Sequence, residues 1–264
     1  MPRFSANLSM LFTEHDFLDR FDAAARAGFE AVEYVGPYDY DPDVIAERLR
    51  RNGLSQALFN LPPGDWGRGE RGIAILADRV EEFRRSIDTA IRYAKTLGCL
   101  QVNCLAGIAP EGARRAALED LFVDNLRHAA ERLKEAGIRL LIEPINARDI
   151  PGFFLNTSRQ ALAIIDRVGS DNLFLQYDIY HMQVMEGDLA RTLEQNLDSI
   201  AHIQIADNPG RHEPGTGEID YPFLFGHLDR IGYSGWVGAE YRPMAGTEAG
   251  LGWLQAAGRE KSAA

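Results

Sequence analysis

Four oxygen-bearing side chains in the second half of this 264-residue sequence each stand at the end of a short apolar run. They are Glu143 in Leu-Ile-Glu-Pro, Asp178 in Gln-Tyr-Asp-Ile-Tyr-His, Gln204 in His-Ile-Gln-Ile-Ala-Asp and Glu240 in Gly-Ala-Glu-Tyr. Carboxylate and amide oxygens are the ligands that hard divalent cations prefer, and a pair of carboxylates can also move protons to and from a substrate. The pattern raises the hypothesis of a metal-dependent enzyme.

Taken singly, each of these residues is equally well explained as a solvated group or a helix cap. Taken together they are not, because a carboxylate buried without a partner costs on the order of several kcal/mol, and three of them cannot all stay ionised side by side. No Lys or Arg stands at the same strand ends to pair with all three. Since the set holds no thiolate and no ligand histidine, we predict a Mg²⁺ or Mn²⁺ site formed by Glu143, Asp178, Gln204 and Glu240.

Two basic or aromatic groups near these residues are candidates for substrate binding. His181 follows Asp178 by three positions, and Arg211 opens a glycine-rich segment at 210–217 together with His212. Arginine presents a planar fork of donors that suits a substrate carboxylate. For both histidines a purely structural role stays open as the alternative.

Three further residues are expected on the same side of the fold. Asn103 and Glu33 end two earlier apolar runs, and Asn103 is a candidate for substrate binding, whereas the role of Glu33 stays open. Trp66 lies in Pro-Pro-Gly-Asp-Trp-Gly-Arg-Gly-Glu-Arg-Gly, which is too polar and glycine-rich for a core. We expect this segment to form a lid that brings Trp66 to the substrate and excludes water, with an ordinary surface loop as the alternative.

The elements that must position these residues follow a repeating pattern. Short apolar or β-branched runs alternate about eight times with longer segments of helical periodicity. The predicted strands cover residues 4–8, 31–35, 55–60, 100–104, 140–143, 173–178, 202–205 and 237–240. Glycines suited to the left-handed end of a helix precede most strands, at Gly28, Gly53, Gly98, Gly137, Gly169 and Gly232. We expect Asp41 and Ser158 to cap two of the helices.

Eight such units predict an α/β fold, a closed (β/α)8 TIM barrel. The connections that follow the third, fourth, fifth and seventh strands are long, at 61–77, 106–113, 144–157 and 206–221, whereas the turns that lead into strands are short. This asymmetry places the working face at the C-terminal ends of the strands. A Rossmann-like sheet is disfavoured because no G-x-G-x-x-G follows the first strand. We expect one domain over residues 1–257 and a C-terminal tail over 258–264.

Composition limits the class of protein. A net charge of −11 and a pI near 5.1, without a Lys/Arg run, disfavour nucleic acid as a partner. No stretch approaches the ~20 apolar residues of a membrane span, and the first residues lead into a strand rather than a signal sequence, so we expect a cytoplasmic protein. The two cysteines, Cys99 and Cys104, are expected to be reduced core thiols. The sequence is compatible with a homo-oligomer.

Several motifs together resemble the hydroxypyruvate isomerase family of the xylose isomerase-like barrels. They include Asn60-Leu-Pro62, Leu141-Ile-Glu-Pro-Ile-Asn146 and the segments at 4–12, 64–66, 69–73, 176–183, 202–209, 213–219 and 236–241. The match covers all eight predicted strands. The resemblance implies conversion of hydroxypyruvate to tartronate semialdehyde (2-hydroxy-3-oxopropanoate), with Glu143 and Glu240 as the proton-transferring pair and the metal on the four residues named above. One departure is Phe59, where relatives tend to carry His, and it leaves the substrate more open than the reaction type.

The implied reaction takes a proton from a carbon beside a carbonyl, passes through an enediolate and returns a proton one carbon away. It needs no nucleotide or flavin, and we expect neither. The alternatives are a 2-oxo-tetronate isomerase or keto-sugar epimerase on the same scaffold and an apurinic-site nuclease. The nuclease would need several metals with many histidine ligands, which six histidines and the negative charge disfavour. A binding barrel without activity would not need two opposed glutamates.

Overall fold

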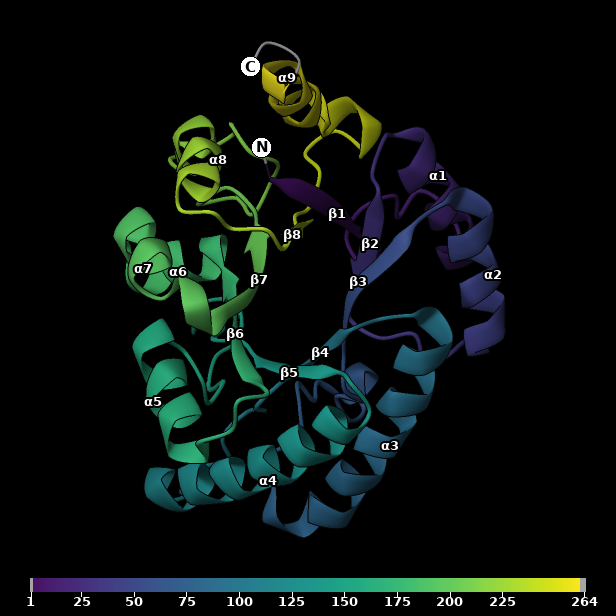
Figure 1. Cartoon of the computed structure of the whole chain (residues 1–264). Helices are drawn as coiled ribbons and strands as arrows, with labels where there is room; N and C mark the ends of the chain where they lie inside the picture. The colour runs from purple at the N-terminus through teal and green to yellow at the C-terminus, as the bar shows by residue number, and fades with distance from the viewer. Residues whose placement is uncertain (1, 262–264) are drawn as a thin grey trace.

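A computed structural model of the chain describes residues 2–261. Eight parallel strands form a closed barrel in which each strand pairs with the next and the last pairs with the first (Figure 1). The strands are β1 (Arg3–Asn7), β2 (Ala31–Tyr34), β3 (Ser55–Asn60), β4 (Gln101–Cys104), β5 (Arg139–Ile142), β6 (Leu173–Asp178), β7 (Ile200–Ile205) and β8 (Trp236–Ala239). The predicted (β/α)8 barrel and all eight predicted strands are confirmed.

Helices surround the barrel and cover its outer face (Figure 1). They are α1 (Arg20–Arg26), α2 (Pro42–Asn52), α3 (Val80–Leu97), α4 (Arg115–Glu135), α5 (Ser158–Val168), α6 (Ile179–Met185), α7 (Leu189–Gln195), α8 (Tyr221–Arg230) and α9 (Gly252–Lys261). One large apolar cluster joins their inner faces to the strands. Among the described residues, no helix combines the length and apolar character needed to cross a bilayer.

The helix ends follow the expected chemistry with one exception. All six predicted glycines have a positive φ, and Asp41 caps α2 by accepting from the backbone N of Asp43 at 2.9 Å. The expected cap at Ser158 is wrong: Thr157 caps α5 by accepting from the N of Gln160 at 3.2 Å. Thr157 keeps an extended backbone, as an N-cap does, and Ser158 is already helical. Adjacent Thr and Ser leave such a boundary uncertain by one residue.

The end of the chain packs back onto its beginning. The ring of Trp253 in α9 contacts that of Phe4 in β1, with centroids 5.0 Å apart. The expected division between domain and tail at residue 257 falls inside α9, which continues through Lys261. Residues 262–264 lie outside the described part of the chain. Cys99 and Cys104 are free and buried, as expected, and burial raises the pKa of Cys99 to about 12.

The connections at the C-terminal ends of the strands are long where the sequence predicted them. The β3–α3 connection contains a 3₁₀ turn at Trp66–Arg68, and the β4–α4 and β5–α5 connections meet through a bridge between Ile108 and Phe153. The β7–α8 connection folds on itself through a bridge between Asp207 and His212. These connections form the face on which the predicted site residues lie.

Candidate active site

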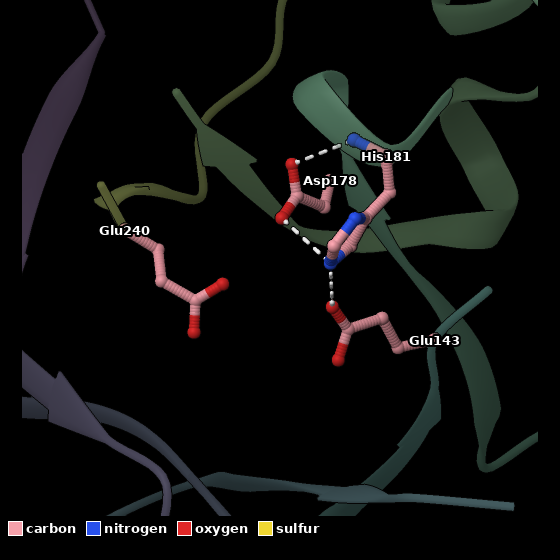
Figure 2. A group of neighbouring side chains, drawn as sticks. All are labelled: Glu143, Asp178, His181 and Glu240. Carbon is pink, nitrogen blue, oxygen red and sulfur yellow. Dashed lines mark hydrogen bonds and ion pairs between the residues drawn. The ribbon is translucent and has the colours of Figure 1, made fainter. Parts of the chain in front are cut away.

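The barrel gathers three of the predicted metal ligands at its C-terminal mouth. Glu143 directly follows β5, Asp178 ends β6 and Glu240 directly follows β8. Together with His181 of α6 they offer four ligand atoms that all lie within 4.8 Å of one another, and all four side chains are buried (Figure 2). This cluster of acidic and histidine side chains could hold a metal ion.

Asp178 has one oxygen fixed by the backbone and one left for the site. Its Oδ1 caps α6 by accepting from the N of Tyr180 at 2.8 Å and the N of His181 at 3.3 Å. Its Oδ2 is buried and has no hydrogen-bond partner, although the Nε2 of His181 lies 3.5 Å away. A buried carboxylate oxygen without a donor costs free energy that a cation would recover, so the residues fit a bound metal.

The charges of the cluster lead to the same conclusion. Burial, with the nearby Glu240 and Asp178 adding to it, raises the pKa of Glu143 well above its ordinary value. Burial likewise raises the pKa of Glu240 to about 8 and that of Asp178 to about 6. Without a metal ion, Glu143 and Glu240 would hold protons near neutral pH, and Asp178 would do so in mildly acidic solution. A divalent ion bound by their oxygens would replace those protons.

The hydrogen bonds of His181 fix its tautomer. Asn146 accepts from the backbone N of Arg148 at 3.0 Å and of Asp149 at 2.7 Å through its Oδ1, so its amide nitrogen must face the ring. That nitrogen lies 2.7 Å from Nδ1 of His181. Nδ1 therefore accepts, and the proton is on Nε2. Burial and the positive charge of Arg211 lower the pKa of His181 well below its ordinary value, so the ring is neutral and presents an N–H to the site.

Arg211 lies much closer to the carboxylates than the sequence suggested. Its Nη2 donates to Oε2 of Glu240 at 2.8 Å and lies 3.9 Å from Oδ2 of Asp178, while Nη1 donates to Asp149 at 3.1 Å. The sequence offered no Lys or Arg at the strand ends to pair with all three carboxylates, and Arg211, which pairs with Glu240, comes instead from the β7–α8 connection. In the fold of this connection Arg211 adopts a positive φ and turns inward. Its neighbouring carboxylates outweigh burial and raise its pKa, so the guanidinium stays charged.

A carboxylate that the sequence analysis missed holds that connection in place. Asp207 accepts from four backbone N–H groups, those of Asn208 at 3.0 Å, Gly215 at 2.9 Å, Gly217 at 2.9 Å and Ile219 at 3.1 Å. The signal in the sequence was an Asp directly after an apolar strand and before a glycine-rich segment, which is typical of a carboxylate that organises a turn.

Asn103 and Gln204 lie where the sequence placed them. Asn103 donates through Nδ2 to Oε2 of Glu143 at 3.0 Å, so it orients this glutamate. Gln204 lines the same cavity as Glu143 and Glu240, and its Oε1 accepts from Nε2 of Gln176 at 2.6 Å. Gln204 as a metal ligand stays a prediction. In β1, which pairs with β8, Asn7 donates to Oε1 of Glu240 at 3.0 Å, and the sequence analysis missed this residue.

The structure does not bring Trp66 to the carboxylates. Its side chain is 42% exposed and the guanidinium of Arg71 lies 3.8 Å from the centre of its ring. Trp66 lines a groove of about 680 Å³, and Val35 lines both this groove and the cavity between Glu143 and Glu240. That cavity measures about 10 Å³, roughly the space of one water.

Comparison with known proteins identifies the family. The model of the xylose isomerase-like TIM barrel family matches residues 21–257. The chain belongs to this family. As a member of the xylose isomerase-like barrels it is 56% identical to the hydroxypyruvate isomerase of Escherichia coli K12 over 96% of this chain and 98% of that protein. It is 51% identical to the 2-oxo-tetronate isomerase of Cupriavidus necator over 97% of this chain and 98% of that protein.

One solved structure is also close to this xylose isomerase-like barrel. It is a crystal structure named AP endonuclease, family 2, from Brucella melitensis, with 48% identity, a TM-score of 0.95 and coverage of 97% of this chain and 99% of that one. The curated relatives, which are similar over nearly the whole length, show that the chain is an isomerase. The buried carboxylates at the mouth of the barrel are the groups available to its chemistry.

Proposed function

We propose that this xylose isomerase-like barrel interconverts a small 2-oxo acid that carries a neighbouring hydroxyl group and its aldehyde isomer. The first candidate is hydroxypyruvate, which would give tartronate semialdehyde. The observation that carries the proposal is the pair Glu143 and Glu240, which are buried and brought together with Asp178 within 4.8 Å at the strand ends. The names of the two curated relatives support the same reaction type.

The reaction needs a base that acts at one carbon of the substrate and an acid that acts at the neighbouring carbon. One glutamate takes a proton from the hydroxymethyl carbon, which gives an enediolate, and the other supplies a proton to the former carbonyl carbon. The hydroxyl proton moves to the other oxygen, so that all atoms are conserved. A raised carboxylate pKa, such as the value of about 8 for Glu240, suits a group that must both hold and release a proton near neutral pH.

The surrounding donors fit the charges of such a substrate. The Nε2–H of His181 lies 3.5 Å from Oδ2 of Asp178, and the guanidinium of Arg211 lies 3.9 Å from the same oxygen, so both can donate to oxygens of an acid bound beside it. Glu143, Asp178, Gln204 and Glu240 would hold a divalent cation, Mg²⁺ or Mn²⁺ by our proposal, and when bound it would stabilise negative charge on the substrate oxygens. Asn103 and Asn7 keep the two glutamates oriented.

Two other activities are to be compared by experiment. A 2-oxo-tetronate differs from hydroxypyruvate by one carbon, and the groove beside the cavity offers space for it. A nuclease is suggested by the name of the Brucella structure, but the net charge of −11 opposes binding to a phosphate backbone. We therefore propose a small acid as the substrate and the cytoplasm as the location, with neither nucleic acid nor membrane as a partner.

The test is a comparison of kcat/KM for hydroxypyruvate, a 2-oxo-tetronate and a keto-sugar, after chelation and after addition of Mg²⁺ or Mn²⁺. A duplex with one abasic site serves as the nuclease substrate. We expect turnover of a 2-oxo acid that is lost on chelation and restored by the cation. Cleavage of the duplex without turnover of any 2-oxo acid would overturn the proposal.

A further inference from the structure

A second buried carboxylate lies deeper in the barrel than the proposed catalytic pair, and the proposed reaction does not use it. Glu33 of β2 is fully buried. Its Oε2 accepts from the hydroxyl of Ser5 at 2.7 Å and lies 2.8 Å from Nε2 of His202. Its Oε1 accepts from Nε2 of Gln204 at 2.7 Å and from Nδ2 of Asn7 at 3.3 Å. These four partners hold the buried carboxylate in one orientation.

The neighbouring strand leaves space for this carboxylate. A Cβ atom on Gly238 of β8 would lie 2.3 Å from both carboxylate oxygens of Glu33, so any side chain there would force the carboxylate or the strand to shift. Gly238 belongs to a strand and its φ is outside the left-handed region, so its backbone does not demand glycine. The requirement is for space alone. The glycine at position 238, on the strand that leads to Glu240, thus leaves room for the carboxylate of Glu33.

Glu33 determines which end of the Gln204 amide faces the site. An ionised carboxylate only accepts hydrogen bonds, so Gln204 must turn its nitrogen toward Glu33. The oxygen of Gln204 then points away from Glu33 and accepts from Nε2 of Gln176. Both glutamines line the same cavity as Glu143. An oxygen can bind a cation, whereas an amide nitrogen that carries two hydrogens cannot.

The same carboxylate acts on Glu240 through Asn7. The Oδ1 of Asn7 accepts from the backbone N of Ser9 at 3.0 Å, so its amide nitrogen faces the two acids. One nitrogen then donates to Glu33 at 3.3 Å and to Glu240 at 3.0 Å. The position of Glu240 is therefore linked to that of Glu33 by a single shared donor.

We propose that Glu33 is a positioning residue that directs the oxygen of Gln204, and through Asn7 the carboxylate of Glu240, toward a divalent cation in the cavity. This inference rests on the proposed function, since it concerns the metal of that same site. Groups that orient metal ligands in this way typically contribute about 10- to 100-fold to metal affinity.

The experiment measures Mn²⁺ affinity directly, by calorimetry and by the EPR signal of free Mn²⁺, on metal-stripped protein without substrate. Glu33→Met keeps an unbranched side chain and removes the acceptor, so we expect Mn²⁺ to bind about 10- to 100-fold more weakly. Glu33→Gln can still offer its oxygen to Gln204 while its nitrogen turns to Ser5, so we expect it to retain affinity within about threefold. Gly238→Ala displaces the carboxylate without removing a partner and should also weaken binding.

Asn172→Ala is the matched control, because Asn172 donates to the carbonyl oxygens of Ala130 and Ile138 at the opposite end of the barrel. It should lower the melting temperature and leave Mn²⁺ affinity unchanged. If Glu33→Met does not fold, Gly238→Ala decides. Wild-type affinity in a folded Glu33→Met or Gly238→Ala variant, or an equal loss in Glu33→Gln, would overturn the role of Glu33. A wild-type chain that binds no Mn²⁺ would instead overturn the metal centre of the proposed function and the inference with it.

Discussion

At the scale of single residues, the site depends on carboxylates whose protons are easily exchanged. Burial raises the pKa values of Glu143, Asp178 and Glu240, because a buried carboxylate loses the contact with water that would stabilise its negative charge. The neutral His181 and the charged Arg211 are donors at the same place. The chemistry of the site therefore follows from which group holds a proton and where that proton points.

Replacement of Glu240 by Gln should reduce kcat about 10²- to 10⁴-fold at saturating metal concentration, because the amide cannot take or return a proton. The exposed Glu248 provides a matched control, and Glu248→Gln should retain wild-type kcat and melting temperature. Steady-state kinetics of the two purified variants checks this. Unchanged turnover in Glu240→Gln would remove this residue from the reaction.

Replacement of Asn146 by Asp should alter catalysis through His181 without touching the substrate. A carboxylate beside Nδ1 attracts the proton to that nitrogen, so the ring no longer presents a neutral Nε2–H to the site. We expect kcat/KM to fall about 10- to 100-fold. The ¹⁵N chemical shifts of His181 report the tautomer independently of activity. Chemical shifts of the wild-type protein that place the proton of His181 on Nδ1 would contradict the account.

At the scale of elements, strand ends were predictable from the sequence, whereas loop conformations were not. Glu143, Asp178 and Glu240 were identified because an acidic residue at the end of an apolar run must lie at the mouth of a parallel barrel. The inward turn of Arg211 depends on the four backbone donors that gather around Asp207, and these come from positions up to twelve residues away in the chain. Such an arrangement leaves no periodic signal in the sequence.

Replacement of Asp207 by Asn should loosen the β7–α8 connection, since an amide nitrogen would face two of the N–H donors. We expect a loss of about 1–3 kcal/mol in the free energy of unfolding and a fall of kcat/KM of about 10-fold as Arg211 loses its position. Asp220→Asn is the control on the same connection, because Asn caps a helix as well as Asp and α8 should be unaffected. Denaturant unfolding and kinetics on both variants check this; equal effects from the two would refute the role of Asp207.

At the scale of the whole molecule, closure of the barrel makes the site. Asn7 and Glu240 are separated by 233 positions in the chain, and Glu33 and Gln204 by 171, yet each pair is joined by a hydrogen bond. The strand pattern predicted the closure, but not which inward side chains would meet across it. The roles of Asn7 and Glu33 therefore became visible only in three dimensions.

The stability of the metal-free chain should fall as pH rises. The folded pKa values of Glu240, about 8, and Asp178, about 6, exceed the ordinary values of 4.5 and 3.8, so between these limits the folded chain binds more protons than the unfolded chain. The free energy of unfolding then decreases from about pH 5 to pH 8. Bound Mg²⁺ or Mn²⁺ replaces the protons and should flatten this decrease, as should Glu240→Gln. Melting curves with and without the cation measure it, and identical slopes would be inconsistent with the site.

The central claim is that a proton, taken up and released by opposed glutamates, moves between adjacent carbons of a small hydroxy-keto acid. Proton NMR in D₂O, with hydroxypyruvate, the enzyme and Mg²⁺ or Mn²⁺, tests it most directly. We predict enzyme-dependent formation of the aldehyde with deuterium at the former carbonyl carbon, and no such product with Glu240→Gln. Transfer of a hydrogen from the hydroxymethyl carbon to the former carbonyl carbon without exchange from the first turnover, or no aldehyde from any 2-oxo acid, would contradict the account.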